Sequence, residues 1–247
     1  MNRRDFTHAN NPSFACAESV LLLPFGRRSY LPAIVEVWGG EEVVLDETVD
    51  REVYHLRGTS RPVSLIYSGM GSPAAANALE MAAAAGGRRV VVFGACGGVV
   101  PEVGVGELIV ATGGVRGEGT SRYYAPPEFP AAFDPMLTAG LWEAASASGV
   151  AAHRGMVYTT DAGYRQGPEI YEECAGLVIG VESECAAAAV VGASLGLVMG
   201  ALLFCTDNVT LARDEDHGYR GLGDPRVRRA FDAGLAVVIE VLSNPIE

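Results

Sequence analysis

Long apolar runs, repeats and linkers are all missing from this sequence of 247 residues. Its apolar runs, such as SVLLLP at 19–24, are far shorter than the roughly 20 residues that cross a membrane. The N-terminal stretch carries two arginines without an apolar segment behind them, so a secretory signal is not expected. We therefore expect one folded unit without membrane contact.

Positive charge is scarce as well. The formal net charge is −12 at pH 7, which argues against non-specific binding to nucleic acid. Hydrophobic residues make up 49% of the chain, enough for a sizeable core. These values predict a cytoplasmic protein that binds neither nucleic acid nor a membrane.

Metal-binding patterns are missing too. The five cysteines contain no Cys-x-x-Cys pair, and the four histidines have no metal-ligand spacing. Most cysteines stand in apolar or alanine-rich stretches, so buried reduced thiols are expected rather than disulfides. They are Cys16, Cys96, Cys174, Cys185 and Cys205. No metal and no cofactor is expected.

Apolar stretches alternate with helix-forming stretches along the chain. Several expected strands are apolar on consecutive residues, as in sheets covered on both faces. The strands are expected at 19–23, 53–57, 63–67, 89–93, 107–111, 155–159, 178–181 and 198–205. Helices are expected at 74–85 (with Ser72 as N-cap), 136–148 and 184–195, and from Asp224-Pro225 onward. The alternation predicts an α/β single domain with a central twisted mixed, mostly parallel sheet flanked by helices.

One glycine-rich stretch, VVVFGACGGVV at 90–100, reads as a buried strand that ends in a tight turn. Such turns often bind an anion with free backbone N–H groups. Yet no lysine or arginine stands between Val90 and Arg116, and the turn has no hydroxyl. Ligands of α/β sheets bind at the carboxyl ends of strands. The stretches that matter are therefore 68–72, 94–98, 160–166, 182–184 and 206–208.

Six motifs occur in order at these strand ends. They are SGMGSPAAANALE (68–80), FGACGG (93–98), VGVGELIVATGGVRGEGTSRYYAPPEFPA (103–131), GMVYTTDAGY (155–164), GVESECAAA (180–188) and TDN (206–208). Together they resemble the nucleoside phosphorylase family, which contains purine nucleoside phosphorylases and uridine phosphorylases and shares its fold with the hydrolytic methylthioadenosine nucleosidases. The resemblance runs from about 19 to 208, most of the chain.

The resemblance implies roles for two acidic residues. Breaking an N-ribosidic bond leaves positive charge on the sugar and negative charge on the departing base. Glu184 matches the glutamate that binds the ribose hydroxyls, and Asp207 matches the aspartate that protonates a purine base. Two alternatives stay open: Glu184 as a solvated residue at a helix start, and Asp207 as a turn or cap residue.

The resemblance also implies further sugar contacts and an assembly. The remaining ribose residues are Glu182 (binding or orienting), Ser183 at the family's methionine position, Met70 and His8. His8 would be lent to the neighbouring subunit's site. The N-terminal segment 1–18 is thus expected to serve that site, and 19–247 to form the domain. A homo-oligomer built from dimers follows, either a dimer or a hexamer.

The phosphate site departs from the family pattern. Relatives have an arginine two residues before Gly94 and a serine or threonine just after it, where this chain has Val92 and Ala95. Both positions are expected to face the same cavity. The candidate phosphate residues are Gly26, Arg27, Arg28, Arg51 and Ala95. Arg51 would be lent by a neighbouring subunit.

The base site departs as well. Relatives place a stacking phenylalanine two residues after the position of Asp161, where this chain has Gly163. Without the ring the pocket is wider, so a purine or a bulky modified base fits better than uridine. The expected base-pocket residues are Cys96, Gly97, Gly163, Tyr164, Arg165 and Gln166.

The expected activity is cleavage of the N-glycosidic bond of a nucleoside or modified nucleoside. A pentosyltransferase would do this by phosphorolysis to base and ribose 1-phosphate, with a remodelled phosphate site and phosphate as co-substrate. Two alternatives remain: a hydrolytic nucleosidase that uses water, and a non-catalytic nucleoside-binding relative.

Overall fold

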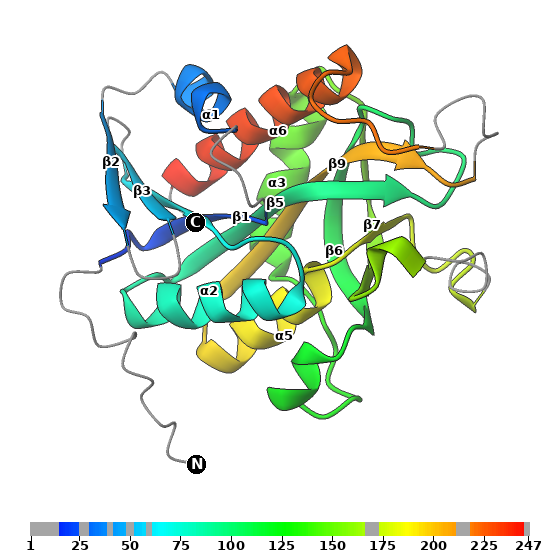
Figure 1. The fold of residues 1–247 in the computed structure, drawn as a ribbon, viewed down its shortest axis with the longest axis horizontal. Helices are drawn as coiled ribbons and strands as arrows, with labels where there is room; N and C mark the ends of the chain where they lie inside the picture. The colour runs from blue at the N-terminus through cyan, green and yellow to red at the C-terminus, as the bar shows by residue number, and fades with distance from the viewer. Residues whose placement is uncertain are drawn as a thin grey trace.

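The computed structural model describes residues 15–24, 30–38, 42–47, 52–57, 61–165, 173–210 and 218–244. The strands are β1 (Ser19–Leu23), β2 (Glu42–Glu47), β3 (Glu52–Arg57), β4 (Val63–Tyr67), β5 (Arg89–Gly98), β6 (Leu108–Gly117), β7 (Ala152–Thr160), β8 (Gly180–Glu182) and β9 (Val198–Asn208). They form one mixed sheet in the order β2-β3-β4-β1-β5-β8-β7-β6-β9 (Figure 1). The expected α/β fold with a mixed sheet is confirmed.

The second half of the sheet closes on itself, because β5 also pairs with β9. Strands β5, β8, β7, β6 and β9 thus form a ring, to which β1, β4, β3 and β2 are added at β5. Parallel pairs join β1 to β4 and β5, β5 to β9, and β7 to β6 and β8. The remaining pairs are antiparallel. This closure was not expected from the sequence.

Helices cover both faces of the sheet (Figure 1). One face packs against α2 (Ser72–Ala84) and α5 (Cys185–Leu195), and the other against α1 (Leu31–Trp38), α3 (Pro135–Ala147) and α6 (Pro225–Ser243). The 3-10 helices η2 (Thr120–Tyr123) and η3 (Gly163–Arg165) lie in connections. Within the described ranges, no helix is both long and apolar enough to cross a membrane.

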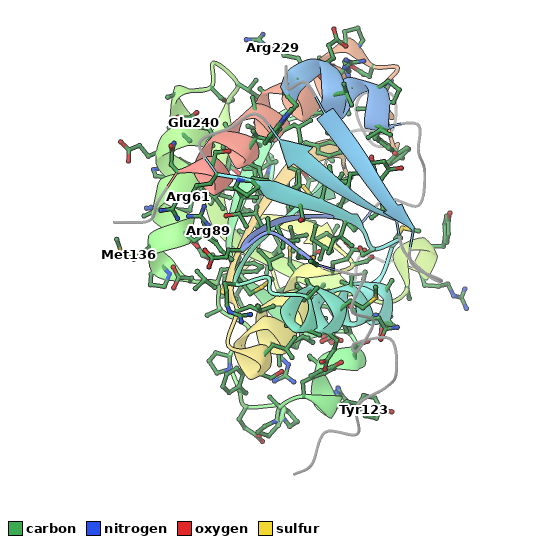
Figure 2. The ribbon with its side chains drawn as sticks, turned by 90° about the vertical axis from the view of Figure 1, so that its left-hand side faces the viewer. Arg61, Arg89, Tyr123, Met136, Arg229 and Glu240 are labelled. Carbon is green, nitrogen blue, oxygen red and sulfur yellow. The ribbon has the colours of Figure 1, made fainter. Side chains whose placement is uncertain are left out.

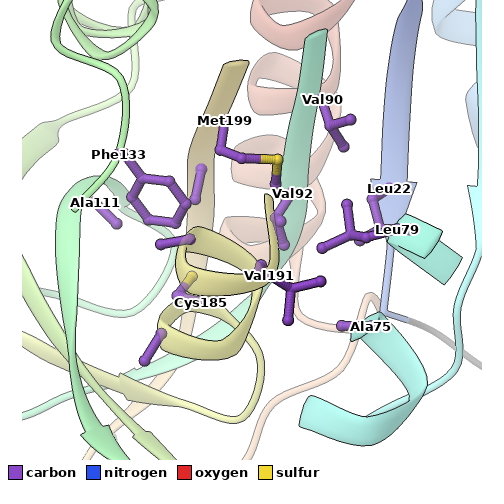
Figure 3. Close-up of a cluster of buried hydrophobic side chains, with 14 of the residues drawn as sticks. Leu22, Ala75, Leu79, Val90, Val92, Ala111, Phe133, Cys185, Val191 and Met199 are labelled. Atoms are coloured by element: carbon purple, nitrogen blue, oxygen red, sulfur yellow. The ribbon is translucent and has the colours of Figure 1, made fainter. Parts of the chain in front are cut away.

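Apolar side chains fill the space between the sheet and each helical layer. Figure 3 shows the layer beneath α2 and α5, where Leu22 and Val92 of the sheet meet Leu79 and Val191 of the helices. Alanines dominate the buried faces of both helices, which contact each other, as the alanine-rich stretches predict. The other layer contains a cluster of three phenylalanine rings, Phe93, Phe204 and Phe231, whose centroids lie 5.4–5.5 Å apart.

Strand β5 does not end at Phe93 but continues through the glycines to Gly98, so the predicted tight turn is wrong. Neither Gly97 nor Gly98 has a positive φ. Both are required by close approach instead. A Cβ on Gly98 would lie 2.8 Å from Asn208 Nδ2, and one on Gly97 would lie 3.2 Å from Asp207 Oδ2. The missing side chains let β9 place polar groups directly against β5.

Two elements and one helix start differ from the sequence-based expectation. The sequence did not predict α1 or β2. Strand β2 lies at the edge of the sheet next to β3, and it begins and ends with glutamate. Its short apolar centre gives little signal. Ser72 is also not the N-cap of α2, because Gly71 takes that position. The hydroxyl of Ser72 donates instead to the carbonyl of Ser183 at 2.7 Å.

Arg89 anchors the end of α6 to the sheet (Figure 2). Its guanidinium donates to the carbonyl of Asn244 at 2.9 Å, to the hydroxyl of Ser19 at 3.0 Å and to the carbonyl of Leu242. The last carbonyls of a helix lack partners within it, and a cation is favourable there. Burial, with a smaller effect of nearby Arg61, lowers the pKa of Arg89. The helix is thereby fixed to the start of β5.

Candidate active site

Three of the expected stretches meet at Gly97. It pairs with Val181 of β8 on one side and with Asp207 of β9 on the other. Neighbouring strands lie about 4.8 Å apart, so Val181 and Asp207 stand about 10 Å apart across Gly97. Glu182 and Glu184 follow Val181 in the chain. The closed ring therefore brings the strand ends that carry the two predicted acids together at Gly97.

Glu184 is buried at the start of α5, with 5% of its surface exposed. Its side chain makes no cap hydrogen bond to α5; its Oε1 accepts from the amide of Gly71 at 2.5 Å. Gly71 has a φ of 99°, a conformation that favours glycine. Burial and the neighbouring Glu182 raise the pKa of Glu184 to about 8. This geometry does not fit a solvated residue at a helix start.

Glu182 is also buried, and protein groups occupy both of its carboxylate oxygens. Oε1 accepts from the hydroxyl of Thr159, and Oε2 accepts from the amides of Glu184 and Cys185, each at 2.7 Å. Burial raises the pKa of Glu182, while these hydrogen bonds lower it. Of its two expected roles, orienting fits this geometry better than ribose binding.

The other two described ribose candidates flank Glu184. Ser183 is half-buried, and its carbonyl is held by Ser72. Met70 is 74% exposed and stands between Gly69 and Gly71, which both have positive φ. Its side chain therefore lies at the surface beside the peptide that binds Glu184.

Asp207 is half-buried next to Gly97. The hydroxyl of Thr206 lies 2.7 Å from Asp207 Oδ1 and 3.2 Å from the carbonyl of Cys96. The carbonyl of Asp207 accepts the thiol of Cys205 at 3.1 Å. Asp207 is thus a strand residue whose carboxylate lies against the glycine gap in β5, rather than a residue of a turn.

The expected base-pocket residues separate into two groups. Gly97 lies at the site, whereas the thiol of Cys96 is buried. A hydrogen bond to Cys205 and burial raise the pKa of Cys96 well above its ordinary value. Gly163, Tyr164 and Arg165 form η3 and are exposed, Tyr164 fully. Gln166 lies outside the described residues.

All five cysteines lie in the described ranges, and none of them forms a disulfide. Burial is confirmed for Cys96, Cys185 and Cys205, while Cys16 and Cys174 are half-buried.

Val92 and Ala95 lie on opposite faces of β5, so the expectation that they face one cavity is wrong. Val92 is fully buried in the layer beneath α2 and α5 (Figure 3). Ala95 packs against the layer beneath α1, α3 and α6. Side chains alternate along a strand, and residues three apart therefore point in opposite directions. An arginine at position 92 would enter the apolar core.

The other candidate phosphate residues and His8 lie outside the described residues. They are Gly26, Arg27, Arg28 and Arg51. Their roles stay predictions.

The sequence did not predict three groups that hold the site together: Thr159, Gly71 and Ser72. Gly71 and Ser72 lie at the end of the expected stretch 68–72, and Thr159 directly precedes the expected stretch 160–166, so their places at strand ends were the available signal. Arg220 was also missed. Its amide donates to the carbonyl of Thr206 at 3.0 Å, which brings the segment before α6 to the end of β9.

This chain belongs to the phosphorylase superfamily, whose family model matches residues 39–233. It is 37% identical over 119 residues to the uridine phosphorylase of Klebsiella aerogenes, a match that covers 48% of this chain and 47% of that protein. It is 29% identical over 157 residues to the guanosine phosphorylase of Halorubrum lacusprofundi, a match that covers 63% of this chain and 64% of that protein. The chain spans about half the length of the curated uridine phosphorylases it matches.

Two solved structures share the fold. The purine nucleoside phosphorylase of Toxoplasma gondii in complex with immucillin-H superposes with a TM-score of 0.80 at 18% identity, covering 93% of this chain and 91% of that one. The uridine phosphorylase of Vibrio fischeri superposes with a TM-score of 0.77 at 22% identity, covering 92% of this chain and 90% of that one. At these identities the likeness concerns the fold alone. With the family match, the resemblance predicted from the six motifs is confirmed.

Proposed function

We propose that this protein is a pentosyltransferase that cleaves the N-glycosidic bond of a nucleoside by phosphorolysis, releasing the base and ribose 1-phosphate. One observation carries the proposal. A half-buried aspartate, Asp207, pairs with Gly97 at the end of β5, and a buried glutamate, Glu184, follows the strand that pairs with Gly97 on its other side. The names of the curated relatives support the phosphorylase chemistry.

In this proposal Glu184 and Asp207 have different catalytic roles. Glu184 binds the ribose hydroxyls and so fixes the sugar while positive charge develops on it. Asp207 gives a proton to the departing base, which avoids expelling an unstable anion. No cofactor has a role, and phosphate is the co-substrate.

The phosphate site belongs to the proposal in a remodelled form. The side chain at position 92 is an apolar core residue, and position 95 has no hydroxyl. Phosphate would then be bound by arginines elsewhere, with Arg27, Arg28 and Arg51 as candidates. The same observation favours a second candidate function, hydrolysis, in which water replaces phosphate as the nucleophile. For the base, the proposal is a purine or a bulky modified base, because this chain has Gly163 where relatives have a stacking phenylalanine.

The phosphate requirement is the direct test. We expect base release from a panel that includes guanosine and uridine to rise with added phosphate, with formation of ribose 1-phosphate. Chromatography of bases and mass spectrometry of the sugar product measure both. Equal release without phosphate, with free ribose as product, would establish hydrolysis. Thermal stabilisation by a nucleoside without any release would identify a binding protein.

We also propose a homo-oligomer built from dimers, since His8 and Arg51 have their assigned roles only in a neighbouring subunit's site. Sedimentation velocity at micromolar concentration is expected to give a dimer or hexamer. A monomer would remove both assignments. The composition-based expectation of a cytoplasmic protein stays a prediction.

A further inference from the structure

The carboxylate of Glu182 is surrounded by hydrogen-bond donors. They are the hydroxyl of Thr159 and the amides of Glu184 and Cys185. The oxygen of Thr159 accepts the amide of Ala186 at 2.8 Å, which directs the Thr159 proton toward Glu182. An ionised carboxyl group only accepts hydrogen bonds, so these donors favour the ionised form while burial opposes it. The Glu182 carboxyl is therefore held by three donors at the N-terminus of α5, where negative charge is favourable.

These contacts hold one short peptide from three sides. Thr159 of β7 and Glu182 of β8 fix the amides at the start of α5. From α2, Ser72 binds the carbonyl of Ser183 and the amide of Gly71 binds the carboxyl of Glu184. The peptide that carries the candidate sugar ligand thus has little freedom to move. A displacement of about 1 Å in such a group can cost on the order of 10²-fold in rate.

We propose that Glu182 is a positioning residue that acts on the sugar only through Glu184, by holding the backbone of Glu184 with a carboxylate that Thr159 fixes. This inference rests on the proposed function, because it takes Glu184 as the ribose ligand. It assigns the first acidic residue of the Glu-Ser-Glu sequence a role distinct from that of the second.

The charge of Glu182 has a second effect on its neighbour. Burial and Glu182 raise the pKa of Glu184 to about 8, because two adjacent buried carboxyls do not both ionise readily. Among the described residues, the other titratable groups around the pair are Cys185 on α5, Cys96 on β5 and Asp207 on β9. Both thiols have raised pKa values and stay neutral. Glu182 therefore adds to the effect of burial, which is the larger cause, in keeping the proton on Glu184.

A stability experiment tests this link without any substrate. The free energy of unfolding is measured from pH 5 to 9 for wild type, Glu184→Gln, Glu182→Gln and the double variant. The difference in the free energy of unfolding between wild type and Glu184→Gln changes with pH as Glu184 titrates. In the Glu182→Gln background we expect that titration to move to lower pH by about one to two units. The matched control is Glu118→Gln, which neutralises another buried glutamate that caps a turn through Ser121; it should leave the titration in place.

A kinetic double-mutant cycle tests the positioning role. Glu182→Gln is expected to lower kcat/KM for the best nucleoside of the panel by about 10- to 100-fold. The same change made in Glu184→Gln should have less than about 2-fold effect, because nothing remains to position. Thr159→Val should resemble Glu182→Gln, and Thr159→Ser, which keeps the hydroxyl, should restore activity.

Additive losses in the cycle would show that Glu182 contacts the substrate itself and would overturn the proposal. An unchanged Glu184 titration in the Glu182→Gln background would overturn the charge link even if the variant were inactive. If the wild type cleaves no nucleoside, the proposed function fails, while the unfolding measurements still decide whether Glu182 acts on Glu184.

Discussion

Replacing Glu184 by glutamine is expected to lower kcat/KM for a ribonucleoside by about 10²- to 10⁴-fold while the protein stays folded. In its ionised form Glu184 accepts two charge-assisted hydrogen bonds from the ribose hydroxyls, which contribute about 1.5–3 kcal/mol each, and 1.4 kcal/mol corresponds to tenfold. Steady-state kinetics measures the loss, and calorimetric titration with a nucleoside measures the loss of binding. The control is Glu143→Gln at an exposed position of α3. Unchanged binding would return Glu184 to a structural role.

The same variant is expected to gain stability relative to wild type as pH rises. The pKa of Glu184 in the folded protein, about 8, lies above its ordinary value of 4.5. The stability tied to its proton is therefore fully present below pH 4.5 and is lost as pH rises toward 8. Glutamine carries no such proton. The stability of the variant relative to wild type should therefore increase between pH 4.5 and 8 by at most about 1.4 kcal/mol per pH unit. Denaturant unfolding at pH 5, 6.5 and 8 measures it. A difference that is constant with pH would contradict the buried, protonated carboxyl.

Replacing Asp207 by asparagine is expected to slow cleavage of natural purine nucleosides by about 10²- to 10⁴-fold, the usual contribution of a general acid. A nucleoside whose base already carries a positive charge, such as 7-methylguanosine, needs no proton to depart. Its cleavage should slow far less. The ratio of the two kcat/KM values in each protein isolates proton donation from binding.

Asp134→Asn is the matched control, because Asp134 caps α3 through the amides of Met136 and Leu137, and asparagine caps a helix as well as aspartate does. Equal slowing of both nucleosides by Asp207→Asn would remove Asp207 from the acid role and leave it a structural residue of β9.

Sequence patterns predicted the buried strands well where the apolar run is continuous, as at 19–23 and 63–67, which match β1 and β4. They failed where glycine serves close packing instead of a turn. Gly94 to Gly98 look like the end of a strand, but their missing side chains make room for Pro24, Asp207 and Asn208. Sequence alone does not show which neighbour will fill the space beside a glycine. The error in the faces of Val92 and Ala95 follows from that turn, since strand alternation would have separated them.

Motif order predicted the candidate site, but its internal connections could not be predicted in the same way. Glu184 and Asp207 stand out because an acidic residue follows a buried apolar strand. Glu182 has the same appearance, and only its contact with Thr159, 23 residues earlier in the chain, separates its role from that of Glu184. The contact of Gly71 with Glu184 spans 113 residues. Such pairings depend on sheet order, which local sequence does not encode.

The closure of the ring by β9 has a consequence for synthesis on the ribosome. The hydroxyl of Thr206 and the carbonyl of Cys96, which meet across β9 and β5, are 110 residues apart. At about 5–20 residues per second, the glycine end of β5 waits roughly 5 to 20 seconds for this partner to be made. During that time an apolar strand lacks a neighbour on one side, the state in which nascent chains associate with one another. The segment that completes the candidate site is thus also the segment that ends the exposure of the nascent sheet.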